Sequence, residues 1–406
     1  MKILLLLTAL FPYDSGEEFL SEEVKHIRGF DRVLVCPCNL KENSAVTKKL
    51  PDFAECVPLK RTDSGKSVYA KLLARPYVLT EIGALMREGR FSSGRLHEML
   101  FFMKKAQELY AALVRSIRFD SADEVTIYSY WFYDAAAAGS LLAEYLRGRG
   151  VQVTQISRAH GFDIHEERAK YGYLPMRRFL LSRVDGLFPC SQNGADTVIG
   201  RYPEYAAKIH PALLGTADHG EKPGNRERGL QILSCSYMVP VKRLHLLIQA
   251  LKQAEFPVTW THIGSGPLEK EIRETAASLP GNVQTRFTGQ MDNTAVMDYY
   301  KTNAVSAFVN VSASEGIPVT VMEACSFGIP VVATDVGGTR EAVTDGVNGF
   351  LLSKDFSPEE LLANLRKLRD MPEDEYGRLC AGSRGIWAEK FDAAYNYQKF
   401  YEELSK

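Results

Sequence analysis

Residues 311–324 read VSASEGIPVTVMEA and contain two glutamates, Glu315 and Glu323. Glu315 lies among small residues, directly after a strand-like run. A helix is predicted from Pro318 up to Gly328, because the missing N–H of proline has no partner at the first position of a helix anyway. Glu323 then lies among apolar helical neighbours, where a carboxylate without a partner is costly. The stretch predicts a strand, a loop and a buried helix, with two carboxylates that need partners.

The same alternation of short apolar runs and helical stretches extends along the whole chain. In the first half the predicted strands are KILLLLTAL (2–10), DRVLVCPC (31–38), EVTIYSYW (124–131), VQVTQISRAH (151–160) and VDGLFPCS (184–191). In the second half they are LQILSCSY (230–237), PVTWTHIGSG (257–266), VQTRFTG (283–289), AVSAFVNVS (304–312), IPVVATD (329–335) and GFLLS (349–353). This alternation is typical of doubly wound parallel sheets, and a chain of 406 residues is too long for one ordinary core.

The boundary between two such domains is predicted within LLGTADHGEKPGNRERG (213–229), where Gly, Pro and charge cluster. We therefore expect α/β domains at residues 1–214 and 215–385. A first helix is predicted around SGEEFLSEEVKHI (15–27), where Ser15 and Glu18 have the spacing of a capping box.

Composition excludes several classes of protein. The net charge of −1 argues against a nucleic-acid binder, which normally has a strongly basic domain. The seven cysteines are odd in number, scattered and without a Cys-x-x-Cys pair, so neither a disulfide framework nor a zinc site is indicated. The apolar N-terminus is followed by acidic residues without a small-residue cleavage site, which favours a buried strand over a signal peptide. We expect a cytoplasmic protein.

Ligands of open α/β sheets bind beyond the carboxyl ends of the strands. The residues at four such ends of the second half are Ser236, Lys242, Arg243, Gly264, Gly266, Gln290, Met291, Glu315, Gly316 and Ile317. The amides of Val319 and Thr320 would form an anion site at the helix start. Glu323 suits vicinal ribose hydroxyls and Glu315 suits sugar hydroxyls. Alternatively, Gly264 and Gly266 only make a tight turn, Glu323 caps a neighbouring loop and Glu315 is solvated. The residues alone leave both interpretations open.

The segment SASEGIPVTVMEACSFGIPVVATDVGGTREAV (312–343) resembles the donor-site motif of retaining glycosyltransferases of family 4. Similar matches are KRLHLLIQAL (242–251), IGSGPLEKEI (263–272), FTGQM (287–291) and EAVTDGVNGFLL (341–352). In the first half, SRAHGFDIHEERAKYGYLP (157–175) and VDGLFPCSQNGADTVI (184–199) resemble enzymes that build bacterial surface polysaccharides. The resemblance implies a GT-B fold, two Rossmann-like domains facing across a cleft. The segment 386–406 would be a helix that returns to the first domain.

The resemblance further implies transfer of a hexose from a nucleotide-diphosphate sugar to a saccharide acceptor, such as a lipid-linked saccharide, with retention of configuration. It makes Glu315, Lys242 and His160 the catalytic candidates. The donor-binding candidates are Gly16, the ten residues named at the strand ends, Val319, Thr320 and Glu323. Asp163 and Ser191 are acceptor-side candidates. Tyr237 departs from the family, which often has arginine there. No Asp-x-Asp pair occurs, so we expect neither a metal nor another cofactor.

Two rival functions use the same features. A nucleotide-sugar epimerase would turn over the donor without an acceptor, and a non-catalytic sugar-binding module would not turn it over at all. A peripheral membrane contact is also predicted. Residues 58–118 contain twelve Lys or Arg against five Asp or Glu, with apolar residues at helical spacing. In that contact Phe101 or Met103 is expected to reach lipid. The alternative is that the apolar stripe packs on the sheet and the charges are merely solvated.

Overall fold

The computed structural model describes residues 1–14, 16–226 and 229–405. The chain divides into two compact units. The first comprises Met1–Ala212 and the chain from Tyr397 onward, and the second comprises Leu213–Asn396. The division lies two residues before the expected boundary. The returning segment begins at Tyr397, because residues 386–396 belong to the second unit.

The first unit is built on a parallel sheet, and its described strands follow the order β3-β2-β1-β4-β5-β6. The strands are β1 Lys2–Thr8, β2 Arg32–Pro37, β3 Ala54–Cys56, β4 Glu124–Ser129, β5 Gln152–Ala159 and β6 Gly186–Pro189. The helices are α1 Leu20–Glu23, α2 Val68–Leu73, α3 Pro76–Arg87, α4 Ser93–Ser116, α5 Asp134–Arg147, α6 Arg177–Arg183 and α7 Gln192–Arg201. Short 3-10 turns are η1 Val24–His26, η2 Glu166–Arg168, η3 Lys170–Gly172 and η4 Pro203–Lys208.

Helix α4 decides between the two interpretations of the basic segment. Its apolar stripe, which includes Phe102, Met103 and Leu109, is buried in the core of the first unit. The prediction that Met103 reaches lipid is therefore wrong, because its side chain is fully buried. Phe101 is 38% exposed. Among the described residues, no helix is both long and apolar enough to cross a membrane.

The first helix begins later than the sequence predicts. Helix α1 starts at Leu20, and Glu18 precedes it in a turn. Ser15, the proposed cap, lies outside the described residues.

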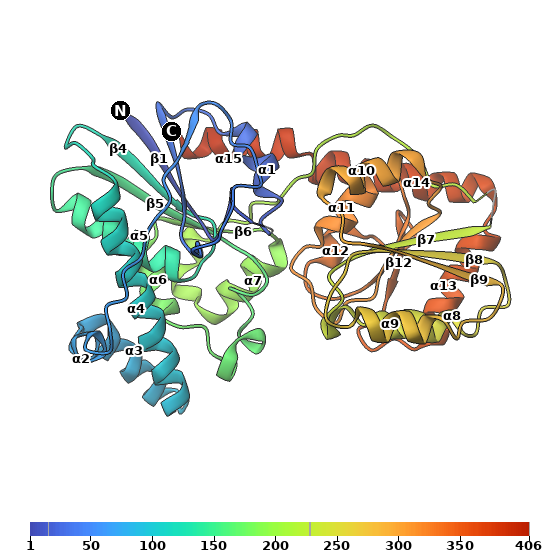
Figure 1. Ribbon diagram of the computed structural model, residues 1–406, viewed down its shortest axis with the longest axis horizontal. Coiled ribbons are helices and arrows are strands. Elements are labelled where there is room, and N and C mark those ends of the chain that lie inside the picture. Colours follow the sequence, from blue (N-terminus) through green and yellow to red (C-terminus); the bar gives the residue numbers. More distant parts are fainter. Residues whose placement is uncertain (15, 227–228, 406) are drawn as a thin grey trace. The chain divides into compact units, whose positions relative to one another are not determined.

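The second unit has a parallel sheet whose described strands follow the order β12-β11-β10-β7-β8-β9. The strands are β7 Leu230–Cys235, β8 Val258–Ile263, β9 Val283–Gly289, β10 Ala307–Asn310, β11 Val331–Thr334 and β12 Gly349–Leu352. The turn η5 Pro240–Lys242 precedes the helices α8 Leu244–Leu251, α9 Glu269–Ala276, α10 Asn293–Thr302, α11 Val319–Ser326, α12 Thr339–Ala342, α13 Pro358–Asp370 and α14 Glu373–Lys390. Helices α8, α9 and α13 cover one face of the sheet, and α10, α11 and α14 cover the other (Figure 1).

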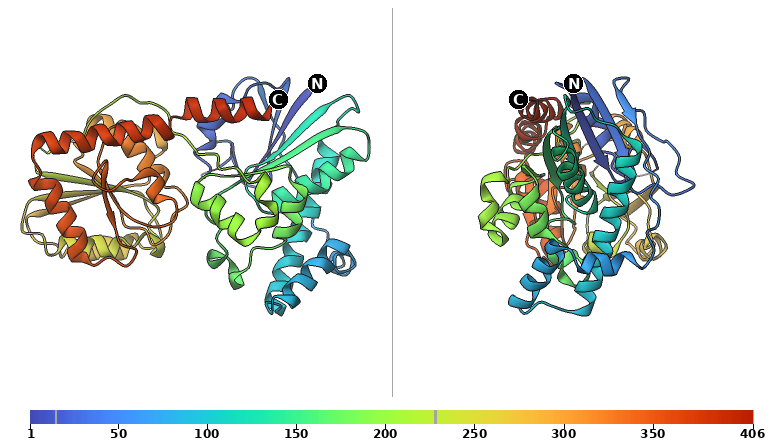
Figure 2. Two further views of the ribbon diagram at one scale, coloured as in Figure 1. Left: turned by 180° about the vertical axis from the view of Figure 1, so that it is seen from behind. Right: turned by 90° about the vertical axis from the view of Figure 1, so that its left-hand side faces the viewer.

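Helix α15 (Ala393–Leu404) completes the core of the first unit. Arg158 on β5 and Glu23 on α1 are both fully buried and form an ion pair at 3.5 Å. Tyr401 of α15 donates its hydroxyl to Glu23 (3.2 Å), and Phe400 lies 4.5 Å from the Arg158 guanidinium. The end of α15 therefore lies beside the first strand, as both views of Figure 2 show, where the Lys2 Nζ donates to the carbonyl of Ser405.

Candidate active site

The carboxyl ends of β7 and β10 are adjacent in the sheet of the second unit, and a small pocket lies between them. Ser236, Lys242, Asn310 and Ser312 are among the residues that line it. The loops that the sequence predicts as ligand-binding thus lie at one edge of one sheet, as the topology of parallel strands requires.

Lys242 and Glu315 form an ion pair at this edge. Lys242 Nζ lies 2.7 Å from Glu315 Oε1, and their side chains are 24% and 12% exposed. Asn310 Nδ2 donates to the same oxygen at 3.3 Å. The Ala313 N–H donates to the carbonyl of Val241 (2.8 Å), so the loops after β7 and β10 are also joined through their backbones. An ammonium group has three N–H donors, so Lys242 can keep Glu315 and still donate to a phosphate.

Arg243 has a different role from the predicted phosphate contact. Its guanidinium donates to the carbonyls of Val311 (2.8 Å), Ser312 (3.1 Å) and Lys354 (2.9 Å). It also stacks on Phe356, 5.1 Å from the ring centroid. These contacts occupy the planar donor fork, so Arg243 holds the loop after β10 in place and is a positioning residue. Tyr237, on the loop after β7, is 58% exposed.

The start of α11 presents two backbone amides. Pro318 is the N-cap in an extended conformation, so the helix begins at Val319, one residue later than predicted. The Pro318 carbonyl already accepts from Val321 N–H (3.0 Å). Within the described chain, no acceptor contacts the amides of Val319 and Thr320. Such unpaired amides at a helix start attract an anion.

The loop that leads into α11 packs directly on the loop after β11. The Gly338 N–H donates to the carbonyl of Gly316 at 2.6 Å. A Cβ on Gly337 would lie 2.0 Å from the carbonyl oxygen of Glu315. Gly337 and Gly338 are therefore site residues that the sequence analysis missed, although DVGG is a visible glycine signal. Ile317 between the two loops is buried.

Glu323 is buried on α11 with one defined partner. Its side chain is 6% exposed, and Asn293 Nδ2 donates to its Oε1 at 2.6 Å. Burial raises the pKa of Glu323 to about 7, and the Asn293 bond opposes that rise. Asn293 is the first residue of α10 and directly follows the loop with Gln290, which is exposed, and Met291, which is half-buried. The sequence analysis missed Asn293, since an asparagine two residues beyond a predicted loop gives no signal.

Gly264 and Gly266 are explained by tight backbone packing. Both have positive φ, and a Cβ on Gly264 would lie 2.0 Å from the Ser236 carbonyl oxygen. A Cβ on Gly266 would lie 2.7 Å from the Met238 nitrogen. The Met238 N–H donates to the carbonyl of Ser265 at 2.8 Å. The tight-turn alternative therefore accounts for both glycines, and the donor contact predicted for them is not needed to explain them.

A buried histidine, His262, holds the Ser236 carbonyl through a hydrogen bond. The Trp260 indole N–H donates to Ser234 Oγ (2.8 Å), and Ser234 Oγ lies 2.8 Å from His262 Nδ1. His262 Nε2 lies 3.1 Å from the Ser236 carbonyl oxygen. Because indole only donates and a carbonyl only accepts, the Ser234 hydroxyl donates to Nδ1 and Nε2 donates to Ser236. Burial lowers the pKa of His262 to about 4, which keeps this arrangement neutral.

In the first unit, His160 directly follows β5 and is enclosed by aromatic rings. Its ring centroid lies 5.8 Å from that of Phe19, 4.9 Å from Tyr130 and 4.4 Å from Trp131. It is 8% exposed, and neither ring nitrogen has a partner in the described chain. Burial lowers the pKa of His160 to about 3, helped by the charge of Arg158. A neutral imidazole with one donor and one acceptor unused is suited to sugar hydroxyls, and it does not act as a cation at neutral pH.

The two acceptor-side candidates are occupied by backbone groups. Asp163 accepts the His160 N–H on Oδ1 (2.5 Å) and the Phe132 N–H on Oδ2 (2.8 Å). Ser191 Oγ accepts the Gly194 N–H (2.9 Å) and caps α7. The direct contact of Asp163 and Ser191 with the acceptor stays a prediction; in the structure Asp163 orients the loop that holds His160.

Gly16 has φ 104°, which favours glycine, and no atom lies within 4 Å of a Cβ built there. The next residue, Glu17, was missed by the sequence analysis. Its carboxylate accepts the amides of residues 9–11 (2.9, 2.7 and 2.7 Å) and the indole N–H of Trp131 (2.6 Å). Glu17 thus fixes one wall of the His160 enclosure.

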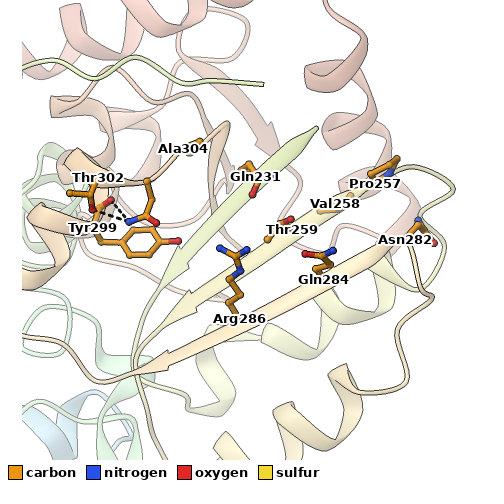
Figure 3. A pocket seen from close by; sticks show the side chains of 11 residues that line it. Gln231, Pro257, Val258, Thr259, Asn282, Gln284, Arg286, Tyr299, Thr302 and Ala304 are labelled. Carbon is orange, nitrogen blue, oxygen red and sulfur yellow. Dashed lines mark hydrogen bonds between the residues drawn. The ribbon is translucent and has the colours of Figure 1, made fainter. Parts of the chain in front are cut away.

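A larger pocket of the second unit lies elsewhere. It measures about 390 Å³ and is lined by Gln231, Thr259, Gln284 and Arg286, near the amino ends of β7, β8 and β9 (Figure 3). Ligands of such sheets bind at the carboxyl ends, so this pocket is separate from the Lys242–Glu315 edge.

Comparisons with known proteins agree with these features. The family model for glycosyl transferases group 1 matches residues 216–378. The putative colanic acid biosynthesis glycosyltransferase WcaL of Salmonella typhimurium is 27% identical over 266 residues, which are 61% of this chain and 62% of the relative. The chain thus spans less than two thirds of that relative. The amylovoran biosynthesis glycosyltransferase AmsK of Erwinia amylovora is 24% identical, with 85% of each chain covered.

Solved structures share the fold over the whole chain. Anabaena Alr3699/HepE in complex with UDP has a TM-score of 0.66 at 18% identity, with 100% of both chains covered. The lipopolysaccharide outer core galactosyltransferase WaaB in its apo form has a TM-score of 0.65 at 15% identity, covering 100% of this chain and 99% of the other. With two parallel sheets of this topology, the chain has the GT-B fold, and its residues 216–378 are a glycosyl transferases group 1 domain.

Proposed function

We propose that the protein is a retaining, family 4-like glycosyltransferase that moves a sugar from a nucleotide-diphosphate sugar to a saccharide acceptor. The observation that supports this most is the Lys242–Glu315 ion pair beside the unpaired amides of Val319 and Thr320, within a glycosyl transferases group 1 domain. The names of the colanic acid and amylovoran relatives favour bacterial surface polysaccharide as the product.

In this proposal the second unit stabilises the departing diphosphate. Negative charge grows on the leaving phosphate as the sugar becomes oxocarbenium-like, and preorganised donors lower the energy of that state. Lys242 and the α11 amides supply such donors, while Glu315 contacts the sugar and Glu323 accepts the ribose hydroxyls. In a front-face reaction the leaving phosphate oxygen takes the acceptor proton. No pair of protein carboxylates acting as acid and base is then required, unlike in glycosidases.

The proposal includes metal independence, because the charge of Lys242 replaces that of a cation on the diphosphate. Uridine nucleotides are the first donors to test. Anabaena Alr3699/HepE and the pneumococcal O-GlcNAc transferase GtfA are both described in complex with UDP.

His160 is proposed to contact the transferred sugar. Its unpartnered ring nitrogens are enclosed by rings that Glu17 and Asp163 hold in place. An aromatic enclosure excludes water, so a hydrogen bond from a sugar hydroxyl to a neutral imidazole forms without competition.

A lipid-linked acceptor and a cytoplasmic, peripheral location remain part of the proposal. The exposed apolar side chains Leu73, Leu79, Met86 and Phe91 come from α2, α3 and the turn after α3. The exposed Lys71, Arg75 and Arg87 accompany them. Such a surface favours an anionic bilayer, and it replaces the α4 stripe as the membrane-facing element.

Incubation with a panel of nucleotide sugars tests the proposal. We expect hydrolysis of one donor, and faster turnover with a saccharide acceptor, in the wild type. Lys242→Ala should abolish both, whereas Lys270→Ala, at an 88% exposed side chain on α9, should be neutral. Release of a new nucleotide sugar would identify the epimerase instead. Tight binding without any turnover would identify a non-catalytic module.

A further inference from the structure

The first unit contains a second pocket, of about 180 Å³, below the loop that holds His160. Phe132, Ile164, Leu174 and Val198 form its apolar walls, and Arg177 of α6 is among the lining residues. The carboxylates of Asp163, Glu166 and Glu167 also line the pocket. The proposed chemistry assigns no ligand to it.

Arg177 has a buried guanidinium in which two of the three nitrogens have no hydrogen-bond partner. Its side chain is 4% exposed and lies over the Phe132 ring at 4.8 Å. Nη1 donates to the carbonyl of Phe132. Nε and Nη2 have no hydrogen-bond partner, and Arg177 makes no ion pair with any residue in the described ranges. The charge of Asp163 offsets part of the cost of burying Arg177 without a direct ion pair, but buried N–H donors without an acceptor remain costly, so the two vacant nitrogens need an occupant.

The identity of the vacant atoms defines that occupant. Nε–H and Nη2–H form one edge of the guanidinium, and this edge accepts a carboxylate or phosphate side-on with two parallel bonds. The same chain shows the geometry elsewhere. Arg369 uses Nε and Nη2 for the carboxylate of Asp370, at 2.5 Å each, and Arg340 uses the same two atoms for Asp335. Arg177 presents this edge without the anion.

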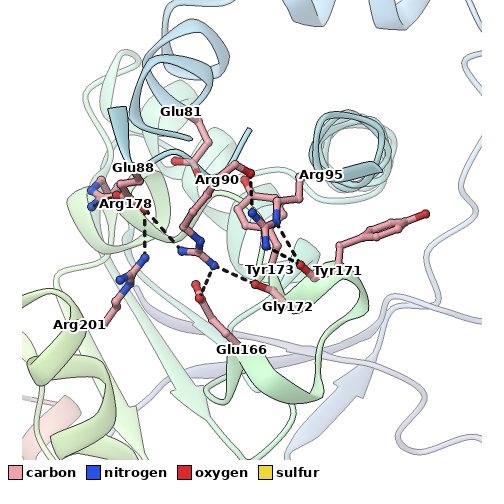
Figure 4. A network of polar contacts seen from close by, with 10 residues as sticks. All are labelled: Glu81, Glu88, Arg90, Arg95, Glu166, Tyr171, Gly172, Tyr173, Arg178 and Arg201. Carbon is pink, nitrogen blue, oxygen red and sulfur yellow. Dashed lines mark hydrogen bonds and ion pairs between the residues drawn. The ribbon is translucent and has the colours of Figure 1, made fainter. Parts of the chain in front are cut away.

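The nearest carboxylates of the protein are already engaged. Asp163 uses both oxygens for backbone amides, as described above. Glu166 Oε2 lies 2.6 Å from Arg90, and Arg178 and Arg201 share Glu88 (Figure 4). This network joins the end of α3 to η2, α6 and α7 at the rim of the pocket. Glu167, the remaining carboxylate of the lining, lies 3.4 Å from His165. An anion from outside the chain can therefore bind Nε and Nη2 of Arg177 without displacing an internal pair.

We propose that this pocket binds an anionic group of the acceptor, a carboxylate or a phosphate, through the Nε and Nη2 edge of Arg177. Asp163 lines this pocket and also accepts the His160 N–H, so the pocket and the His160 loop share one residue. The assignment of this anion to the acceptor rests on the proposed function, whereas the anion site itself does not.

Titration calorimetry of the full chain, without nucleotide sugar, tests the site. The probes are glucuronate for a carboxylate, glucose 1-phosphate for a phosphate, and methyl glucoside as the neutral counterpart. We expect one of the two anions to bind the wild type, and methyl glucoside not to bind. Arg177→Met should weaken binding of that anion about tenfold or more, since charge-assisted hydrogen bonds are lost. Arg178→Met is the matched control on the same helix, and it should bind as the wild type does.

Arg177→Lys keeps the charge and loses the side-on edge, so we expect intermediate affinity; this variant carries the test if Arg177→Met does not fold. No binding of either anion to the wild type, as a pocket filled only by water predicts, would overturn the site, and so would equal binding of all three probes. Wild-type affinity in both folded Arg177 variants would overturn it too. Nucleotide-sugar hydrolysis in the same preparations separates the two hypotheses. Hydrolysis without anion binding removes the pocket proposal, and anion binding without turnover removes the transferase proposal.

Discussion

Donor affinity should depend on the ionisation of Glu323. Burial holds the pKa of this carboxyl at about 7 instead of 4.5, which corresponds to about 3 kcal/mol against the ionised form. Ribose hydroxyls donate more strongly to a carboxylate than to a neutral carboxyl group, so the donor should select the ionised state. With a pKa near 7, the ionised fraction falls from about nine tenths at pH 8 to about one tenth at pH 6. We expect the donor Kd to rise about tenfold over that interval.

The assay is calorimetric titration of the nucleotide diphosphate at pH 6, 7 and 8, with two variants. Glu323→Gln should bind weakly and without this pH dependence. Asn293→Ala removes the bond that opposes the rise of the Glu323 pKa, so its midpoint should move to higher pH. An unchanged Kd between pH 6 and 8 in the wild type, or the same slope in Glu323→Gln, would refute the reasoning.

The free protein should show the opposite preference. Because the folded pKa of Glu323 is above the unfolded value, its contribution to stability is present below about pH 4.5 and is lost as the pH rises through 7. Glu323→Gln should therefore raise the Tm of the free protein at pH 8, although it weakens binding of the donor.

Three further outcomes are expected. Glu315→Gln should lower the rate of transfer by at least about a hundredfold, since it removes the carboxylate charge that faces Lys242 and the sugar, with little change in Tm because the amide oxygen still accepts from Lys242; near wild-type turnover would exclude Glu315 from the reaction. Transfer should continue in excess chelator, and a loss that manganese or magnesium restores would show that a metal is required. Anionic vesicles should co-sediment the protein at low salt, and Leu79→Asp with Met86→Asp should abolish this, whereas equal binding to neutral vesicles would favour a soluble acceptor.

The sequence predicts the alternation of strands and helices because buried parallel strands are continuous apolar runs. Eleven such runs each contain an observed strand, and the exception is the edge strand β3, Ala54–Cys56, which is short and mixed in polarity. Helix starts were less predictable. Pro318 satisfies the rule for the first helical position, yet it adopts the N-cap conformation one residue earlier.

The site could be predicted only where a residue type is costly in its place or where a residue follows a predicted strand. Glu323 was visible for the first reason, whereas Lys242 was visible because it follows the end of a predicted strand. Arg243 is adjacent to Lys242 in sequence, but its left-handed backbone conformation turns its side chain toward backbone carbonyls. No sequence pattern predicts that conformation. Glu17, Asn293 and Arg177 act through contacts with segments distant in the chain, so folding alone reveals them.

The Arg158–Glu23 ion pair has a consequence for the order of synthesis. Tyr401 and Phe400, which complete its surroundings, are added only after the ribosome has made the whole second unit. Domains generally fold as they emerge, N-terminal first. The first unit of this chain cannot do so fully, since a buried arginine and glutamate wait for α15. The packing around this ion pair is therefore completed only after the chain of the second unit has been made.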